Sequence, residues 1–322
     1  MNRAMVLVFA ATLLSLGATF CQAAYPDKPV KIIVAYPAGG GPDYVVRVVA
    51  QKLNEKSMGP FVVENRPGAN GTIAASLVVK AEPDGYTVLF TAGGPISIGV
   101  NLVKKLPYDP VKDLTPVTLA ITAPLVLMVN ASLPVTSVSE LLVRARSSKK
   151  PMSYASSGLG SEHHLAGELL KLRGGIDLIH VPYKGFGAAV GDAIGGTVDL
   201  IFGTVPAALP HIAGGRLRPL GLASAARVPA LPNVPTMEKS GLPDFEVVSW
   251  FGLLVPAKTP PDIVQFLNHE FVKVLNTPDI RERFQQEGMI VNASTPDEFA
   301  RYIATDTRRW AELVKAAHIS ID

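Results

Sequence analysis

The stretch from residue 30 to residue 47, VKIIVAYPAGGGPDYVVR, most constrains what this chain can fold into. Its first part, residues 31–35, is a short apolar run rich in β-branched side chains, which suits a buried strand. Three glycines at 39–41 then break the pattern, and Pro42 and Asp43 are residue types that open helices. This order predicts a strand, a glycine turn and a helix in direct succession.

A glycine turn that opens a helix exposes backbone N–H groups at the positive end of the helix dipole, where an anion binds favourably. The same turn can also be a plain connection, and one turn alone does not separate these interpretations. A second unit follows, with a strand at 152–155, a small-residue turn at 156–160 and Ser161 as a helix N-cap. Two such turns in separate α/β domains predict a cleft with an anion between facing helix ends.

Predicted strands and helices alternate along the chain, which indicates mostly parallel sheets flanked by helices. Thr91 ends the third predicted strand, at the sheet edge where ligands of such folds bind. Two long apolar runs, 117–130 and 245–255, are expected to carry the chain into a second domain and back, the first as a strand pair interrupted at Pro124. These crossings divide the chain into one lobe of 24–124 with 249–322 and another of 125–248.

The end of the chain predicts three more helices, beginning near residues 261, 279 and 296. Their apolar stripes, which include Trp310, are expected to pack against the first domain. Trp250 lies in the second apolar run, and we expect it at the hinge or in the core rather than in the cleft.

The first residues are typical of an export signal, with Arg3 before an apolar segment at 5–16 that is too short to span a bilayer. Small residues at Cys21 and Ala23 predict cleavage after Ala23, and the large Phe20 argues against a lipid anchor. Cleavage removes the only cysteine, so the mature chain can form no disulfide and has no thiol nucleophile. We therefore expect an exported protein of the periplasm.

Charge and motif content argue against several other functions. Charged residues make up 18% of the chain and the net charge is +3, and the densest basic spot, Lys149-Lys150, is too small for a nucleic-acid surface. No G-x-S-x-G or H-E-x-x-H motif occurs, and the S-x-x-K match at 147–150 lies in a polar turn. His164 and Glu168 share a helix face, but no further metal ligand is near them, so packing or a ring N–H donated to the cleft is the favoured role of His164.

Several motifs in this order resemble one family, the substrate-binding receptors of tripartite tricarboxylate transporters, also called Bug-type receptors. The likeness covers essentially the whole mature chain. It rests on YPDKP at 25–29, on 37–43, on ENRPG at 64–68, PDGY at 83–86, LPYDP at 106–110, YAS at 154–156, HVPYKG at 180–185 and SWFG at 249–252.

The resemblance implies a two-lobed periplasmic binding fold whose cleft captures a small carboxylate and whose partners are membrane permease subunits. We also expect a monomer without a cofactor and without a nucleic-acid partner. The turns at 36–43 and 156–164 are the segments that match the carboxylate-holding loops of the family. The expected ligand-binding residues are Tyr36, Ala38, Gly39, Gly40, Asp43, Thr91, Ser156, Ser157, Gly158, Gly160, Ser161, His164, Phe202 and Thr204.

The chain departs from the family pattern at three places. The first turn lacks the usual threonine before Asp43, and the second has Leu159 and Ser161 where Asn and Thr are common. Gly203-Thr204 stands where Asp-Asn is common, which makes the distal pocket less acidic. A dicarboxylate or an aromatic carboxylate is therefore favoured over an amino acid. A receptor that serves a sensor protein instead of a permease remains an alternative, and a hydrolase is a weaker one.

Overall fold

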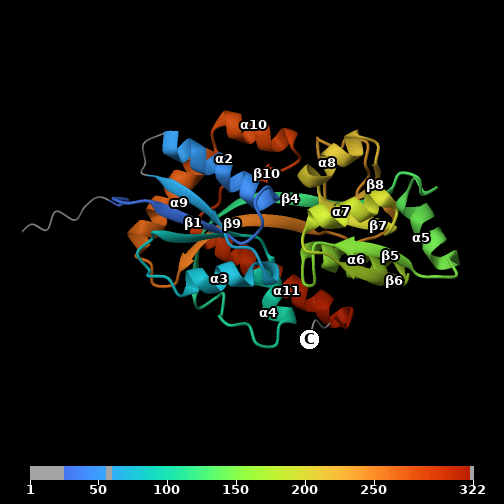
Figure 1. The fold of residues 1–322 in the computed structure, drawn as a ribbon, viewed down its shortest axis with the longest axis horizontal. Coiled ribbons are helices and arrows are strands. Elements are labelled where there is room, and N and C mark those ends of the chain that lie inside the picture. The colour runs from blue at the N-terminus through green and yellow to red at the C-terminus, as the bar shows by residue number, and fades with distance from the viewer. Residues whose placement is uncertain (1–24, 56–59, 320–322) are drawn as a thin grey trace, which may run out of the picture.

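The computed structural model describes residues 25–55 and 60–319, so the expected signal peptide and its cleavage site after Ala23 lie outside the described residues. Two lobes lie side by side and are joined at a waist where two long strands cross (Figure 1). No helix in the described ranges is long and apolar enough to cross a membrane. The two-lobed α/β architecture expected from the sequence is confirmed.

The first lobe is built on three parallel strands, in which β1 (Val30–Val34) lies between β2 (Phe61–Asn65) and β3 (Thr87–Thr91). Helices α2 (Gly41–Glu55), α3 (Thr72–Val79) and α4 (Gly99–Leu102) belong to the same lobe. The predicted strand, turn and helix at 30–47 are therefore present. Buried aliphatic and aromatic side chains cover both faces of this sheet, as expected for parallel strands between helices.

The second lobe repeats the pattern with β5 (Met152–Ser156) paired in parallel to β6 (Leu178–Pro182) and β7 (Leu200–Thr204). Its remaining strand is β8 (Leu217–Ala223). Its helices are α5 (Val138–Ser147), α6 (Glu162–Gly174), α7 (Phe186–Gly195) and α8 (Val205–Ala213). The second predicted strand–turn–helix unit is thus formed by β5 and α6.

The two crossings are β4 (Leu114–Asn130) and β9 (Val248–Pro256), which pair antiparallel. Pro124 of β4 lies opposite Val248, and from Leu125 onward β4 pairs with β7 and β8 instead. The expected strand pair is therefore wrong, because β4 is one continuous strand of 17 residues. Proline is tolerated here since it stands where β4 changes partners, so its missing N–H removes little from either ladder.

Three helices close the chain, α9 (Pro261–Leu275), α10 (Pro278–Gln286) and α11 (Pro296–Ala316), and a short strand β10 (Ile290–Val291) pairs with β4. Phe299 and Ile303 of α11 pack in the first lobe, but Trp310 and Leu313 pack with the core of the second. The expectation that Trp310 packs against the first domain is therefore wrong. A helix of 21 residues is about 30 Å long, enough to pass beneath the waist from one lobe to the other (Figure 1).

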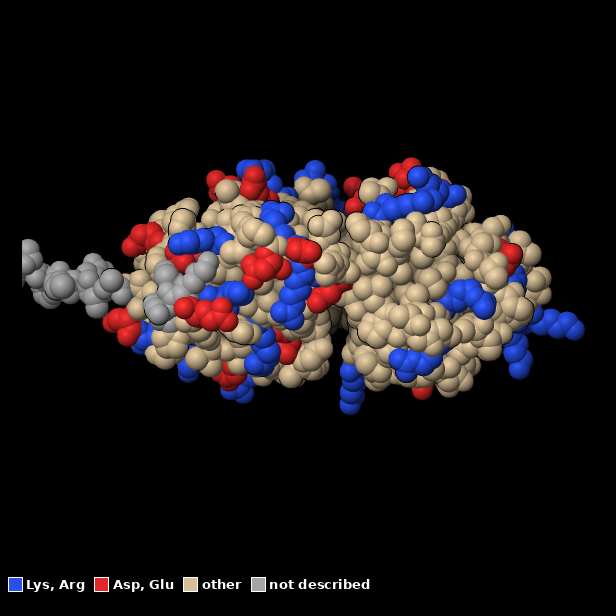
Figure 2. All heavy atoms as spheres, turned by 90° about the horizontal axis from the view of Figure 1, so that it is seen from above, with Lys and Arg blue, Asp and Glu red and all other residues tan. Residues whose placement is uncertain are grey.

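Charged residues are not gathered into one large patch on the face seen in Figure 2. Lysine, arginine, aspartate and glutamate are mixed over the first lobe, and the second lobe shows mostly uncharged surface in this view. The waist between the lobes is visible as a narrow constriction. The face in view therefore offers no broad basic surface of the kind that nucleic acid requires.

Candidate functional site

The turn between β1 and α2 is shaped by the Asp43 carboxylate. Its Oδ2 accepts the Gly39 N–H at 2.8 Å, and its Oδ1 accepts from Arg47 Nε at 2.9 Å and from Asn65 Nδ2 at 2.8 Å. Burial opposes ionisation, but the hydrogen bonds from Arg47, Gly39 and Asn65 outweigh it and hold the pKa of Asp43 below its ordinary value. Asp43 is thus an anion resident in the turn, with its oxygens already engaged.

The glycines of this turn have separate roles. Gly39 has a φ of +79°, a conformation that favours glycine, and a Cβ added there meets no atom within 4 Å. The Gly40 N–H donates to Pro37 O at 3.2 Å, and Gly40 itself has no left-handed backbone. Ala38 is exposed, and its N–H has no partner among the described residues. The Ala38 amide and the first turn of α2 are therefore the donors left for an incoming anion.

The turn between β5 and α6 is held by neutral groups. Ser161 is the N-cap of α6, as predicted, because its Oγ accepts the His164 N–H at 3.2 Å. The same hydroxyl donates to Gly158 O at 2.7 Å, and the Gly158 N–H donates to Ser156 Oγ at 3.1 Å. The Gly160 N–H donates to His164 Nδ1 at 3.2 Å. Most polar groups of this turn are thus bonded to one another.

Three histidines line this turn and are kept neutral. His164 stacks on His180 with ring centroids 4.1 Å apart, and Ser156 Oγ lies 2.7 Å from His180 Nε2. Ser157 Oγ lies 2.7 Å from His163 Nδ1. Burial lowers the pKa of His163 to about 4, and burial, followed by the charge of His164, does the same for His180. His164, whose pKa burial also lowers, therefore packs and accepts a hydrogen bond in the turn.

No three histidine, cysteine, aspartate or glutamate side chains come together as metal ligands in residues 25–55 and 60–319. His164 and Glu168 share a helix, but Glu168 bonds to Tyr154 at 2.6 Å and to Lys171 at 2.9 Å. The pairing that made a metal site conceivable is thus used for packing within the second lobe.

The lobes contact each other through the second turn. Asn70 Nδ2, in the first lobe, donates to Gly160 O at 2.7 Å, and the Gly93 N–H donates to Glu162 Oε1 at 3.2 Å. Neither Asn70 nor Glu162 is among the binding residues predicted from the sequence. Asn70 did lie in a recognisable turn segment, but nothing local in the sequence shows a contact with a residue 90 positions away.

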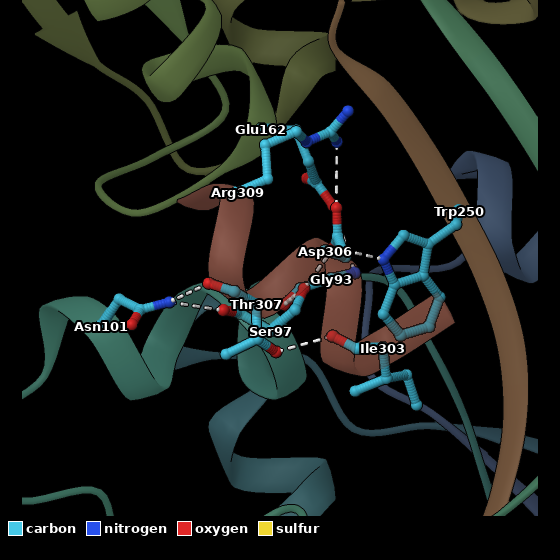
Figure 3. Close-up of polar contacts among 9 residues, drawn as sticks. All are labelled: Gly93, Ser97, Asn101, Glu162, Trp250, Ile303, Asp306, Thr307 and Arg309. Carbon is cyan, nitrogen blue, oxygen red and sulfur yellow. Dashed lines mark hydrogen bonds and ion pairs between the residues drawn. The ribbon is translucent and has the colours of Figure 1, made fainter. Parts of the chain in front are cut away.

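A further set of polar contacts, centred on Asp306, lies close to Glu162 (Figure 3). The Asp306 carboxylate of α11 accepts from Ser97 Oγ at 2.5 Å, from Trp250 Nε1 at 2.9 Å and from Arg309 Nη2 at 2.9 Å. Trp250 is buried and comes from the crossing strand β9, so it packs in the core, one of the two places expected for it. Strand β9 and helix α11 are therefore tied together next to the contact between the lobes.

The remaining predicted residues occupy different surroundings. Thr91 is buried at the end of β3, near the Tyr36 hydroxyl, which is buried and has no hydrogen-bond partner within residues 25–55 and 60–319. Burial, and then the charge of Glu162, raise the pKa of Tyr36 well above its ordinary value, so this atom lies near both the first turn and Glu162. Thr204 is the N-cap residue of α8, with no hydrogen bond from its side chain to the helix.

Phe202 lies in the core of the second lobe, stacked on Phe245 with centroids 6.0 Å apart. Its position favours packing over contact with a ligand. Leu159, at the tip of the second turn, has 48% of its surface exposed and is the apolar side chain that this turn offers to solvent.

A cavity of about 610 Å³ lies at the waist but contains none of the predicted ligand-binding residues. It is bordered by α10, β10, α11 and the segment after β8. Arg227, Arg281 and Arg309 line it, with Glu246 and Asp306. This cavity is therefore distinct from the two predicted turns.

Known proteins of the same architecture identify the family. Residues 45–319 match the description of the tripartite tricarboxylate transporter family receptor. Protein BugT of Bordetella pertussis is 36% identical over 97% of this chain and 96% of its own length. The structure of Rpa4515 of R. palustris with adipate has a TM-score of 0.88 at 34% identity, over 92% of this chain and 99% of that one.

A further solved structure is MatC from Rhodopseudomonas palustris with bound malate. It has a TM-score of 0.83 at 32% identity and covers 90% of this chain and 100% of its own. These similarities extend over both lobes, in agreement with the motifs that the sequence shares with Bug-type receptors. The chain therefore belongs to the tripartite tricarboxylate transporter receptor family, a family of solute-binding receptors.

Proposed function

We propose that this protein captures a small organic carboxylate between its lobes in the periplasm and delivers it to a tripartite tricarboxylate-type permease. The observation that carries the proposal is the pair of helix-opening turns, one in each lobe, the second of which contacts the first lobe through Asn70 and Gly93. The positive ends of α2 and α6 favour an anion there. The adipate and malate bound by two structural relatives support a carboxylate as that anion.

The proposed ligand-binding residues are those predicted from the sequence except Phe202, which packs in the core, and they have different roles. Asp43, Ser156 and Ser161 hold the shapes of their turns. The Ala38 amide, the first turns of both helices and the orphaned Tyr36 hydroxyl are the groups that meet the ligand. Groups already bonded within the turns contribute by positioning these donors.

The tail of the ligand is proposed to lie near Leu159 and Thr204, which carry no charge. A dicarboxylate or an aromatic carboxylate suits this surface better than an amino acid, whose ammonium group needs an acidic partner. Thr204→Asp adds such a partner and should weaken binding of adipate relative to an amino acid. Equal relative affinities of both ligands in wild type and variant would place the specificity pocket elsewhere.

We propose that the lobes move as the bodies 24–124 with 249–322 and 125–248, about the crossing strands. The change of β4 partners at Pro124 supports this division. Because Trp310 of α11 packs in the second lobe, movement of the lobes must also change the packing of α11. Closure about two crossing strands is a known type of hinge motion. Small-angle scattering with and without adipate tests it, since closure reduces the radius of gyration.

Export with cleavage after Ala23 and without a lipid remains part of the proposal. The intact mass of the protein from the periplasm decides it, because a retained or acylated Cys21 changes that mass by a defined amount. A sensor partner in place of a permease is the alternative. Deletion of the gene separates the two, because loss of ligand uptake indicates a permease and loss of a transcriptional response indicates a sensor.

Binding without turnover is tested by a thermal-shift panel of adipate, malate, an aromatic carboxylate and an amino acid, followed by NMR of the incubated ligand. A ligand at a hundred times its Kd should raise stability by about 2.7 kcal/mol. Gly40→Val places a branched side chain in the first turn, 3.2 Å from Pro37 O at its Cβ, and should abolish this shift. Gly191→Val, in open space on α7, is the control. Wild-type affinity in a folded Gly40→Val variant would refute the proposed site.

A further inference from the structure

Glu162 connects the lobes in a way that the two turns alone do not require. It is the first residue of α6 in the second lobe, and its side chain reaches Gly93, which follows β3 in the first lobe. The residue is only 6% exposed, and its Oε1 accepts the Gly93 N–H at 3.2 Å. No ion pair joins Glu162 to a lysine or arginine in the described ranges. The buried carboxyl therefore has a neutral partner across the boundary between the lobes.

Its surroundings disfavour a charge on this carboxyl. Burial, together with the nearby Asp306 carboxylate, raises the pKa of Glu162 to about 7 from an ordinary value of 4.5. The Asp306 charge is already matched by Arg309 at 2.9 Å, so that arginine does not neutralise Glu162. A Cβ at Gly93 would lie 3.1 Å from Trp250 Nε1 and 3.2 Å from Glu162 Oε1, which shows how closely these groups pack.

The other titratable groups facing Glu162 stay in one state near neutral pH. Tyr36 from the first turn and Tyr302 from α11 have their pKa raised, in both cases chiefly by burial, and remain neutral. His163 and His164 on α6 have their pKa lowered by burial and remain neutral as well. Arg309 of α11 faces the same cluster and pairs with Asp306. Near pH 7, Glu162 is therefore the group in this cluster whose charge changes.

We propose that Glu162 is a positioning residue for ligand capture, which holds the lobes together in its protonated form so that closure takes up a proton. This inference rests on the proposed function for the role of closure. Separation of the lobes removes Gly93 from the carboxyl and admits water, and the group then ionises in its ordinary range. A protonated carboxyl keeps an oxygen that accepts the Gly93 N–H and avoids burying a charge.

The linkage has a definite sign. A carboxyl that binds protons more tightly in the closed state favours closure at low pH, and this advantage is lost as pH rises through the closed-state value. With values of 4.5 in the open state and about 7 in the closed state, ligand affinity should be weaker at pH 8 than at pH 6 by up to about tenfold, and by less where the ligand-free protein is already closed at pH 6. The effect is nearly complete at pH 8, so little further loss is expected above it.

Glu162→Gln is the decisive variant, because glutamine has nearly the shape of the protonated carboxyl and does not titrate. Small-angle scattering of the ligand-free protein at pH 6 and pH 8 is the first measurement. Wild type should expand at pH 8, and Glu162→Gln should stay compact at both values. Glu168→Gln is the control, since Glu168 lies on the same helix but bonds to Tyr154 and Lys171 within the second lobe, and it should expand as wild type does.

Calorimetric titration with adipate is the second measurement, at pH 6 and 8 and in two buffers of different ionisation enthalpy. Wild type should take up a fraction of a proton on binding at pH 6 and lose up to about tenfold in affinity at pH 8, and Glu162→Gln should show neither effect. The same pH profile in Glu162→Gln as in wild type overturns the inference. Failure of adipate and every other panel ligand to bind rejects the proposed function, and the scattering comparison then still decides the role of Glu162.

Discussion

The turn that opens α2 and the turn that opens α6 both connect a strand to a helix, but they favour opposite charge states of the acid that each contains. Each carries an acid in the first turn of its helix. Asp43 is the third residue of α2 and folds back onto Gly39, with Arg47 and Asn65 holding its charge. Glu162 is the first residue of α6, reaches outward to Gly93 in the other lobe and has no cationic partner in the described ranges.

The difference shows that the place of an acid in a helix decides what it can do. An acid two residues further into the helix lies over its own loop and stabilises that loop as a charged group. An acid at the first position projects away from its own loop and meets whatever packs against the helix end. The first turn is therefore preassembled within one lobe, whereas part of the second is completed by contact between the lobes.

The largest expected effect comes from Asp43→Ala, which removes three hydrogen bonds from the first turn. A free energy of unfolding lower by about 3 kcal/mol is expected, because Gly39, Asn65 and Arg47 lose a charged partner. Chemical denaturation at pH 7 measures it. Glu162→Gln is the matched variant and should not destabilise the protein at that pH. An equal fall in the free energy of unfolding in both variants would contradict the proposed difference between the two turns.

The two acids should also give stability opposite dependences on pH. The pKa of Asp43 is lowered, so its contribution is present above its ordinary value of 3.8 and is lost as pH falls through the folded value. The pKa of Glu162 is raised, so its contribution is complete below 4.5 and is lost as pH rises through about 7. Between pH 6 and 8 this loss should amount to about 1.4 kcal/mol. Thermal melts should show the alkaline loss disappear in Glu162→Gln and the acid loss shrink in Asp43→Asn.

Asn70→Gly sharpens the comparison by weakening the contact between the lobes without touching either acid. Glycine accepts the left-handed backbone of Asn70, whose φ is 49°, so the turn itself should survive. Loss of the bond to Gly160 O should weaken adipate binding roughly five- to tenfold. Titration calorimetry measures the affinity, and an unchanged value would show that this bond is absent when ligand is bound.

Ser161→Ala should have the smallest effect and should appear in stability alone. The hydroxyl caps α6 through the His164 N–H, and loss of such a cap costs about 1 kcal/mol. Ligand affinity should stay near that of wild type because the hydroxyl is engaged within its turn. A variant with normal stability and weakened binding would instead place Ser161 in contact with the ligand.

The amino-acid sequence by itself determined the features that depend on neighbouring residues. The glycine turn before α2, the Ser161 cap and the proline-led starts of α9 to α11 each follow from backbone preferences over a few positions. The two-lobed fold was recognisable for the same reason, since apolar periods and turn residues are local or recur in a specific order.

Only the tertiary structure decided which polar groups face each other. Glu162 meets Gly93 across 69 residues and Asn70 meets Gly160 across 90, and no periodicity encodes such pairs. Trp310 packs in the second lobe because α11 is long enough to pass the waist, and Phe202 enters the core because Phe245 returns beside it. Burial and charge act through these distant contacts. The raised pKa of Glu162 therefore arises only in the folded protein and does not follow from the residues next to it in the sequence.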